Sequence, residues 1–284
     1  MPSPIGFNLL AWSAPISEKM VPIAERLRAI GYDGIECFID DQNVAAYTRF
    51  GAELGQLGLR STCVMVVGPD ANPASESAAV RAAAVDFLKG AIDRASAMGA
   101  TVICGPIHSA FATFSKREPQ PDEYAHSAEV LHAVGDYAKQ AGIVLAVEAL
   151  NRFECYLCNT MDQLAGLIQK ADHPNVRAMF DTHHANIEEK RFPDAIRTIA
   201  PMLAHVHISE NDRGTPGDGN VRWDDTFRTL AEINYSGWMT IEAFTRNDVD
   251  FANSINVWRE YDDPWAIAEK GFAFIKAMQG EYAG

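Results

Sequence analysis

Four strand-like runs in the second half of the sequence each end on a side chain that can bind a metal ion. These side chains are Glu148, Asp181, His207 and Glu242, called here the rim cluster. Their spacings are 33 residues (148 to 181), 26 (181 to 207) and 35 (207 to 242). Each spacing is close to one strand–helix unit of a (β/α)8 barrel of about 250 residues. Because the carboxyl ends of parallel strands meet at one rim of a barrel, the four side chains are predicted to lie together.

The run Leu203–Ile208 indicates how the side chains of such a strand are distributed. Side chains alternate between the two faces of a strand, so His205 and His207 share one face while Val206 and Ile208 share the other. A polar inner face and an apolar outer face suit a parallel barrel whose outside is covered by helices. His207 is therefore expected to point into the barrel near its carboxyl rim.

The whole chain alternates strand-like and helix-like segments, without a linker or an internal repeat. Strands are expected at 5–11, 34–39, 59–67, 101–105, 143–148, 176–181, 203–208 and 237–242. Helices are expected at 18–30, 43–57, 76–98, 122–140, 161–171, 182–189, 193–200, 223–233 and 263–278. This order predicts an α/β fold, a (β/α)8 TIM barrel that forms a single domain over residues 1–284. The long loop 106–120 is expected to serve as a lid on the carboxyl face.

The composition limits the classes of protein to which the chain can belong. Its 284 residues are 48% hydrophobic, which suits one domain with a large core. The net charge of −14 argues against a nucleic-acid partner, because phosphate binding needs a basic surface. No apolar run is long enough to cross a membrane, and Met1–Ile5 lacks the features of a signal peptide. We therefore expect no membrane partner and a cytoplasmic location.

The five cysteines are expected to be reduced thiols, because their number is odd and their spacing forms no disulfide framework. Cys155 and Cys158 have the CxxC spacing, but no second pair completes a zinc site. They also follow Glu148 in a loop and do not start a thioredoxin-like helix. A structural role is the preferred interpretation of this pair.

The rim cluster is a donor set dominated by oxygen. Three carboxylates and one imidazole favour Mn²⁺, Mg²⁺ or Co²⁺ over Zn²⁺. A divalent ion at such a site can polarise a carbonyl group and hold an adjacent hydroxyl group, so it acts as a Lewis acid and a template.

Polar side chains in the loops directly after the rim cluster are candidates for binding sugar oxygens. They are Glu154, His184 and Arg213. His184 can alternatively cap the short helix that follows it.

Aromatic and other side chains at the ends of further strands are assigned to the same pocket. Phe7, Trp12 and Phe244 are expected near the rim, where a ring either packs against its neighbours or covers one face of a sugar. Cys63 and His108, together with Trp12, are assigned to the far end of the pocket from their strand-end positions alone.

The glycine-rich loop 214–219 follows the strand that carries His207, where barrels often bind phosphate. Asp218 places a negative charge within this loop, and Pro216 removes a backbone donor. The loop is therefore interpreted as a turn, and the substrate is expected to be unphosphorylated.

Four segments of the sequence resemble those of a known family, in its order and spacing. They are Glu148–Glu154, Asp181–Glu189, His205–Arg213 and Ile241–Phe244. Over nearly the whole chain the sequence is similar to the ketose 3-epimerases, which include the D-tagatose, D-allulose (D-psicose) and L-ribulose 3-epimerases among the xylose-isomerase-like barrels. The run from Glu210 to Gly217 looks most like the L-ribulose branch.

The resemblance implies a metal ion, usually Mn²⁺, held by the rim cluster, whose two glutamates would also be the acid–base pair. It implies that Glu154, His184 and Arg213 bind the oxygens at the carbonyl end of a ketose. It also implies a homo-oligomer, either a dimer or a tetramer. His183 and Ala185 depart from the family, in which many members carry phenylalanine and methionine, so the preferred sugar stays open.

Inversion at C3 of a ketose requires removal of a proton beside the C2 carbonyl and its return on the opposite face, through an enediolate. Glu148 and Glu242 end different strands and can flank C3 from opposite sides. Acid–base groups positioned in this way contribute about 10²–10⁴-fold each to the rate. The expected substrate pairs are L-ribulose and L-xylulose, D-allulose and D-fructose, and D-tagatose and D-sorbose.

Several other functions on similar barrels are compatible with parts of the pattern. Hydroxypyruvate isomerase and inosose dehydratase are the closest alternatives. An endonuclease IV-like repair enzyme would need more histidine ligands and a basic face, whereas the chain has 8 histidines in another arrangement and a net charge of −14. Paired glutamates on a metal ion argue against a non-catalytic sugar-binding barrel.

Overall fold

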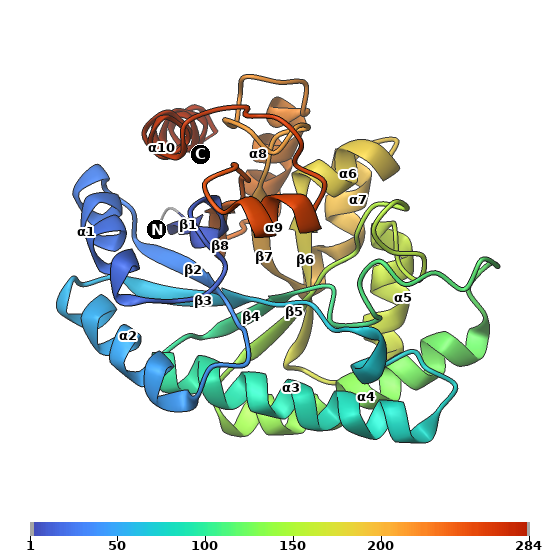
Figure 1. The fold of residues 1–284 in the computed structure, drawn as a ribbon. Coiled ribbons are helices and arrows are strands. Elements are labelled where there is room, and N and C mark those ends of the chain that lie inside the picture. The colour runs from blue at the N-terminus through green and yellow to red at the C-terminus, as the bar shows by residue number, and fades with distance from the viewer. Residues whose placement is uncertain (1–2, 283–284) are drawn as a thin grey trace.

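The computed structural model describes residues 3–282, which form one closed barrel of parallel strands surrounded by helices (Figure 1). The strands pair in sequence order, and the last strand closes on the first. Their bounds are β1 Ile5–Asn8, β2 Gly34–Phe38, β3 Arg60–Val64, β4 Val102–Gly105, β5 Val144–Val147, β6 Val176–Asp181, β7 Leu203–Ile208 and β8 Trp238–Ile241. The predicted (β/α)8 barrel is confirmed; residues 1–2 and 283–284 of the expected domain lie outside the described residues.

Helices follow the strands and cover the outside of the barrel (Figure 1). Their bounds are α1 Val21–Ile30, α2 Val44–Gln56, α3 Ala78–Met98, α4 Pro121–Gln140, α5 Met161–Ala171, α6 Thr182–Glu188, α7 Phe192–Ile199, α8 Trp223–Glu232, α9 Val249–Ser254 and α10 Pro264–Glu281. The sequence predicted each of these helices except α9, which is too short to produce a periodic apolar pattern.

Capping side chains account for the positions at which several helices begin. Asn43 accepts a hydrogen bond from the backbone of Ala46 at the start of α2. Thr160 and Gln163 form a reciprocal capping box at the start of α5, as the sequence predicted for Thr160. Gly99 ends α3 with a φ of 81°, a left-handed conformation that glycine adopts without strain.

β1 is shorter than the predicted strand 5–11. The side chain of Asn8 accepts a hydrogen bond from the backbone N–H of Leu10 at 2.9 Å and starts a short 3₁₀ turn over Leu9–Ala11. A side chain that bonds the backbone two residues ahead competes with strand pairing, so the strand ends at this asparagine.

The two faces of β7 carry different kinds of side chain. Val206 and Ile208 of β7 are buried in the apolar layer between strands and helices. His205 and His207 of the same strand are also buried, but both meet the carboxylate of Glu36 inside the barrel. The predicted alternation of faces in β7 is confirmed.

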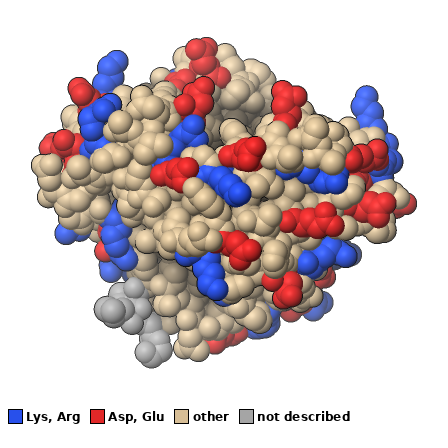
Figure 2. Space-filling view, turned by 90° about the horizontal axis from the view of Figure 1, so that it is seen from below, with Lys and Arg blue, Asp and Glu red and all other residues tan. Residues whose placement is uncertain are grey.

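The outer surface carries acidic and basic side chains interspersed over the face shown in Figure 2. Within residues 3–282, no helix is long and apolar enough to cross a membrane.

Candidate active site

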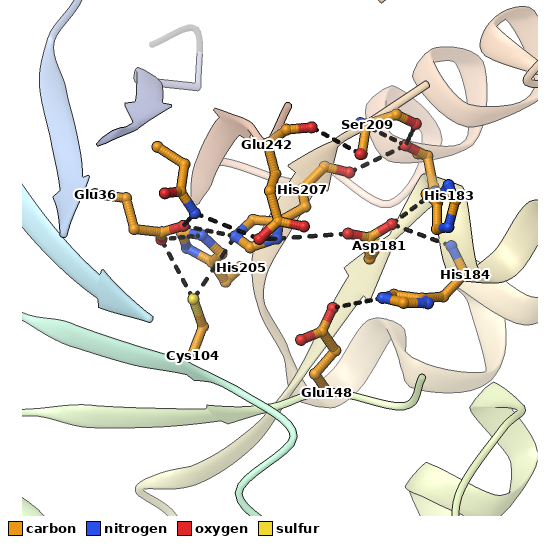
Figure 3. Close-up of polar contacts among 12 residues, drawn as sticks. Glu36, Cys104, Glu148, Asp181, His183, His184, His205, His207, Ser209 and Glu242 are labelled. Carbon is orange, nitrogen blue, oxygen red and sulfur yellow. Dashed lines mark hydrogen bonds and ion pairs between the residues drawn. The ribbon is translucent and has the colours of Figure 1, made fainter. Parts of the chain in front are cut away.

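The rim cluster comes together at the carboxyl end of the barrel because each of its side chains stands at the end of a neighbouring strand. Glu148 directly follows β5, and Asp181 is the last residue of β6. His207 is the next-to-last residue of β7 and pairs in register with Asp181, while Glu242 directly follows β8. All four side chains are buried. The structure thus brings together the four residues that the sequence placed at one rim (Figure 3).

The atoms of the rim cluster face one another at distances longer than a hydrogen bond. Nδ1 of His207 lies 3.5 Å from Oδ2 of Asp181 and 3.4 Å from Oε1 of Glu242. Glu148, Asp181 and His207 each offer a donor atom within 4.8 Å of the others. Oε1 of Glu148 and Nδ1 of His207 are buried without a hydrogen-bond partner among residues 3–282. Buried polar atoms of this kind fit the ligands of one cation, so the donor set fits a divalent metal ion.

The protonation of the cluster follows from its burial and its charges. Burial, together with the charges of Asp181 and Glu242, raises the pKa of the Glu148 carboxyl well above its ordinary value of 4.5. Burial opposes the charged form of His207, but the carboxylates of Glu242 and Glu36 raise the pKa of this imidazole well above 6.5. A metal ion that binds Glu148 and His207 must therefore compete with protons for both groups.

Arg213 supplies the positive charge of the site from the loop after β7. Its Nη1 lies 3.1 Å from Oδ2 of Asp181 and 2.5 Å from Oε2 of Glu242, and it donates to Oγ of Ser209 at 2.9 Å. Its Nη2 lies 3.0 Å from Nε2 of His184. Although burial acts in the opposite direction, the charge of Arg213 holds the pKa of Asp181 well below 3.8.

His184 joins this network and also faces the rim cluster. Its Nδ1 accepts a hydrogen bond from the backbone N–H of Asn151 at 3.1 Å, and its Nε2 lies 3.6 Å from Oε1 of Glu148. Asn151 also donates to Oε1 of Glu154 at 2.8 Å. The N-terminus of α6 is capped by the side chain of Asp181, which accepts hydrogen bonds from the backbone N–H groups of His183 and His184. The alternative prediction, that His184 caps this helix, is therefore wrong.

A cavity of about 700 Å³ opens above the rim cluster. Glu148, Glu242, Glu154, His184 and Arg213 contribute to its polar wall. Phe244 lines it as predicted, and loop 106–120 contributes Phe111 and Ala112. The remaining wall is largely apolar and includes Leu10, Val64, Phe251 and Val257, two of which belong to α9 and the segment after it.

Four residues that the sequence assigned to this pocket lie elsewhere. Phe7 and Cys63 have no exposed surface and lie in the apolar layer around the barrel. Trp12 packs against Phe7 and against Trp265 of α10, with ring centroids 5.2 and 4.8 Å apart. His108 has no exposed surface either and does not line the cavity.

The error for Phe7 and Cys63 is one residue of strand register. Asn8 of β1 and Thr62 of β3 both bond to Glu36 inside the barrel, so their immediate neighbours must face outward. Val64, two residues after Thr62, is the residue of β3 that reaches the cavity.

Glu36 in the middle of β2 is a polar residue of the site that sequence reasoning missed. It is completely buried and lies against both histidines of β7. Its signal in the sequence was a lone carboxylate within the apolar strand Gly34–Phe38, because a buried carboxylate requires partners.

The loop 214–219 folds around the carboxylate of Glu210. Glu210 accepts hydrogen bonds from the backbone of Gly217 at 2.9 Å, and from the backbone of Asn220 and Val221 at 3.1 Å each. It also accepts from Nε1 of Trp223 at 3.0 Å. An internal carboxylate therefore occupies backbone donors that a phosphate group would need, which agrees with the interpretation of this loop as a turn.

Cys155 and Cys158 are buried free thiols beside the site. Cys155 lies 3.3 Å from the hydroxyl of Ser109. Although burial opposes ionisation, His108 and Ser109 lower the pKa of the Cys155 thiol to about 7. A structural role for this cysteine pair stays a prediction.

Comparison with known proteins places this barrel in a family. The family model described as xylose isomerase-like TIM barrel matches residues 24–278. A D-psicose 3-epimerase of Agrobacterium fabrum is 32% identical over 262 residues, which cover 91% of each chain. An L-ribulose 3-epimerase of a Methylomonas species is 31% identical over 273 residues, which cover 93% of this chain and 92% of the relative.

A solved structure supports the same relationship. The structure of an L-ribulose 3-epimerase superimposes with a TM-score of 0.91 at 28% sequence identity, and the match covers 99% of this chain and 96% of that one. The resemblance drawn from the four sequence segments is confirmed. The chain belongs to the xylose isomerase-like TIM barrel family, and it is an enzyme related to the ketose 3-epimerases.

Proposed function

We propose that the protein is a metal-dependent epimerase that inverts C3 of free ketoses. The observation that carries the proposal is a pair of glutamates, Glu148 and Glu242, that line one cavity beside a donor set fit for a divalent ion. Relatives at about 30% identity that are named D-psicose and L-ribulose 3-epimerases support the same reaction.

The test is an assay of the purified protein on L-ribulose, D-fructose, hydroxypyruvate and inosose side by side. Formation of L-xylulose or D-allulose supports the proposal. Turnover of hydroxypyruvate or inosose alone would replace it with one of the two alternative functions on this barrel.

The two glutamates are the groups that would move the proton at C3. A divalent ion held by the rim cluster would supply Lewis-acid stabilisation of the charge that develops on the ketose oxygens. Burial raises the pKa of Glu148, which favours its protonated form, whereas Glu242 is ion-paired with Arg213. One glutamate would take the C3 proton from one face of the ketose, and the other would return a proton to the opposite face.

The polar wall would orient the ketose. Glu154, His184 and Arg213 would bond the oxygens at its carbonyl end. The apolar wall that includes Phe251 would contact the other end of the sugar and influence which ketose is preferred. A homo-oligomer, either a dimer or a tetramer, and a cytoplasmic location complete the proposal.

Metal removal is expected to abolish activity. The rim cluster contains the buried unpartnered atoms Oε1 of Glu148 and Nδ1 of His207, and a cation is the group that would satisfy both. After exhaustive chelation, Mn²⁺ or Co²⁺ should restore turnover better than Zn²⁺, because the donors are mainly oxygen. Bound metal should also raise the Tm, because it binds the folded site. Full activity in the chelated protein, with metal content measured, would contradict the metal role.

The affinity for Mn²⁺ is expected to rise with pH. The pKa of Glu148 lies well above 4.5 and that of His207 well above 6.5 in the metal-free site, so both groups hold protons at low pH. Binding must then release protons, and a higher pH favours their release. Calorimetry in buffers of different ionisation enthalpy measures the number released. A pH-independent affinity without proton release would show that both groups are already deprotonated.

Phe251→Leu is expected to change the preferred ketose while turnover persists. Phe251 lines the apolar wall and packs edge-on against Phe244, with ring centroids 5.5 Å apart. The substitution removes three carbon atoms, and a difference of one methylene group in an apolar pocket already changes the ratio of kcat/KM between two substrates by about tenfold or more. The ratio for L-ribulose over D-allulose is the measurement. Trp258→Ala is the matched control, because Trp258 is 67% exposed and does not line the cavity. If the ratio changes equally in Phe251→Leu and Trp258→Ala, the apolar wall does not determine which ketose is preferred.

A further inference from the structure

Glu36 is a fully buried carboxylate inside the barrel that lies beneath the rim cluster. Its Oε1 lies 2.7 Å from Nε2 of His207 and accepts from Nδ2 of Asn8 at 3.1 Å. Its Oε2 lies 2.9 Å from Nε2 of His205 and accepts from the hydroxyl of Thr62 at 2.9 Å. Figure 3 shows Glu36 beside both histidines, on the side of His207 away from Asp181. Oε1 is therefore hydrogen-bonded to the imidazole of His207 and to the amide of Asn8, whereas Oε2 accepts from Thr62 and lies beside the imidazole of His205.

The same region could be mistaken for a second metal site, because Cys104 also joins it. Glu36, Cys104, His205 and His207 offer four donor atoms within 4.8 Å of one another. A tetrahedral ion bound at about 2.0 Å would hold its ligand atoms about 3.3 Å apart. The distances of 2.7 and 2.9 Å from Glu36 to the two imidazoles are shorter than this separation, and the contact with His207 is a hydrogen bond. The thiol of Cys104 lies 3.3 Å from Oε2 and acts as one more donor to Glu36.

Asn8 extends this network to Glu242. Its Oδ1 accepts from the backbone N–H of Leu10 at 2.9 Å, which fixes the orientation of the amide group. Its Nδ2 must then face the two carboxylates, Glu36 at 3.1 Å and Glu242 at 3.3 Å. The network below the rim thus touches one histidine and one glutamate of the rim cluster.

The contact with Glu36 decides which nitrogen of His207 faces the rim. An ionised carboxylate only accepts hydrogen bonds, so Nε2 of His207 must carry a proton. Nδ1 is then the nitrogen left to bind an ion, and it points toward Asp181 and Glu242 at 3.5 and 3.4 Å.

We propose that Glu36 is a positioning residue for the metal centre, which fixes the ring orientation and the tautomer of His207 through its hydrogen bond to Nε2. The proposal rests on the proposed function, since it assumes that the rim cluster binds the ion. Metal-binding histidines commonly donate their other N–H group to a carboxylate, and loss of that partner lowers metal affinity or activity by about 10–100-fold.

Glu36→Gln tests the proposal with little change in shape. The amide is uncharged and has one accepting oxygen in place of two, so it is a weaker partner than the carboxylate for the Nε2 N–H group of His207. We expect the variant to bind Mn²⁺ about 10–100-fold more weakly than the wild type when calorimetry starts from metal-free protein. At saturating Mn²⁺ it should recover most of the wild-type kcat, because Glu36 acts through His207 and does not touch the sugar.

Thr240→Val is the matched control for a polar change inside the barrel. Thr240 is fully buried, and its hydroxyl has no hydrogen-bond partner among residues 3–282. It should bind Mn²⁺ as the wild type does. Equal affinities in Glu36→Gln and the wild type would overturn the positioning role while leaving the proposed function intact. A wild type that binds no divalent ion would overturn both.

A measurement on the wild type covers the case in which Glu36→Gln fails to fold. In protein loaded with diamagnetic Zn²⁺, ¹⁵N NMR of labelled histidine distinguishes a protonated ring nitrogen from a metal-bound one. We expect His207 to carry its proton on Nε2 and to bind through Nδ1. Binding through Nε2 would overturn the proposal without any variant.

Discussion

Glu148→Gln and Glu242→Gln are each expected to lower epimerase turnover by about 10²–10⁴-fold, because each direction of the reaction needs one base and one acid. Both side chains line the same cavity, and the amide can neither take nor give the C3 proton. The measurement is kcat for both members of a ketose pair, in both directions. Both residues also belong to the rim cluster, so the metal content of each variant must be measured before the loss is assigned to proton transfer.

Solvent deuterium separates this scheme from the alternatives. In D₂O the wild-type product should carry deuterium at C3, with none at C1 or C4, because protons on glutamates exchange with solvent. One of the two variants should still exchange the C3 proton of a single epimer, since the remaining glutamate faces that proton. If the wild type turns over in D₂O but its product carries no deuterium at C3, the two-base scheme is contradicted. Arg222→Ala is a suitable control, because Arg222 is exposed and its guanidinium Nη1 donates to the carbonyl oxygen of Lys190, away from the cavity.

The positions of the rim cluster could be predicted from the sequence because they depend on two simple periodicities. A strand–helix unit repeats along the chain, so each strand end is found by counting, and parallel pairing brings these ends to one rim. Asp181 and His207 pair in register in the structure, which is the local consequence of that repeat. The positions of Glu154 and Arg213 at the cavity followed from the same count, since both lie a few residues beyond their strands.

The far wall of the cavity could not be predicted, because it depends on which face of an apolar strand points inward. The strands around Phe7 and Cys63 are buried on both faces, so their sequences lack the alternation that reveals register. In β7 the histidines alternate with apolar residues, and the assignment of faces was correct. The segment after β8 was a second difficulty for prediction. Phe251 reaches the cavity from α9, and this helix of 6 residues is too short to show a periodic apolar pattern.

Glu36 illustrates how tertiary contacts hide a functional candidate. Along the chain it lies far from every member of the rim cluster, and its strand ends without a second polar signal. Only closure of the barrel brings β2 opposite β7, where its carboxylate meets two imidazoles. A buried charge in an apolar strand is therefore a reason to look for a polar partner on another strand.

Arg213→Ala is expected to lower kcat by about 10²–10³-fold with every ketose, because it removes a charged donor from the place where charge develops. The guanidinium donates to Asp181, Glu242 and Ser209, so its loss should disturb the rim cluster itself and affect all substrates equally. Arg213→Lys keeps the charge but cannot bridge three partners, so it should recover only part of the loss. An effect limited to one ketose would contradict the assignment of Arg213 to the carbonyl end of the sugar.

Arg213→Ala should also make the thermal stability of the protein depend more strongly on bound metal. Arg213 is buried, and the same Nη1 atom lies within 3.1 Å of Asp181 and 2.5 Å of Glu242. Removal of one partner from a buried ion pair destabilises a protein by about 3–5 kcal/mol, because the remaining charge stays uncompensated. A divalent cation can replace that positive charge, so Mn²⁺ should raise the Tm of Arg213→Ala by more than it raises the Tm of the wild type. Equal increases in Tm would show that Arg213 does not neutralise these carboxylates in the metal-free protein.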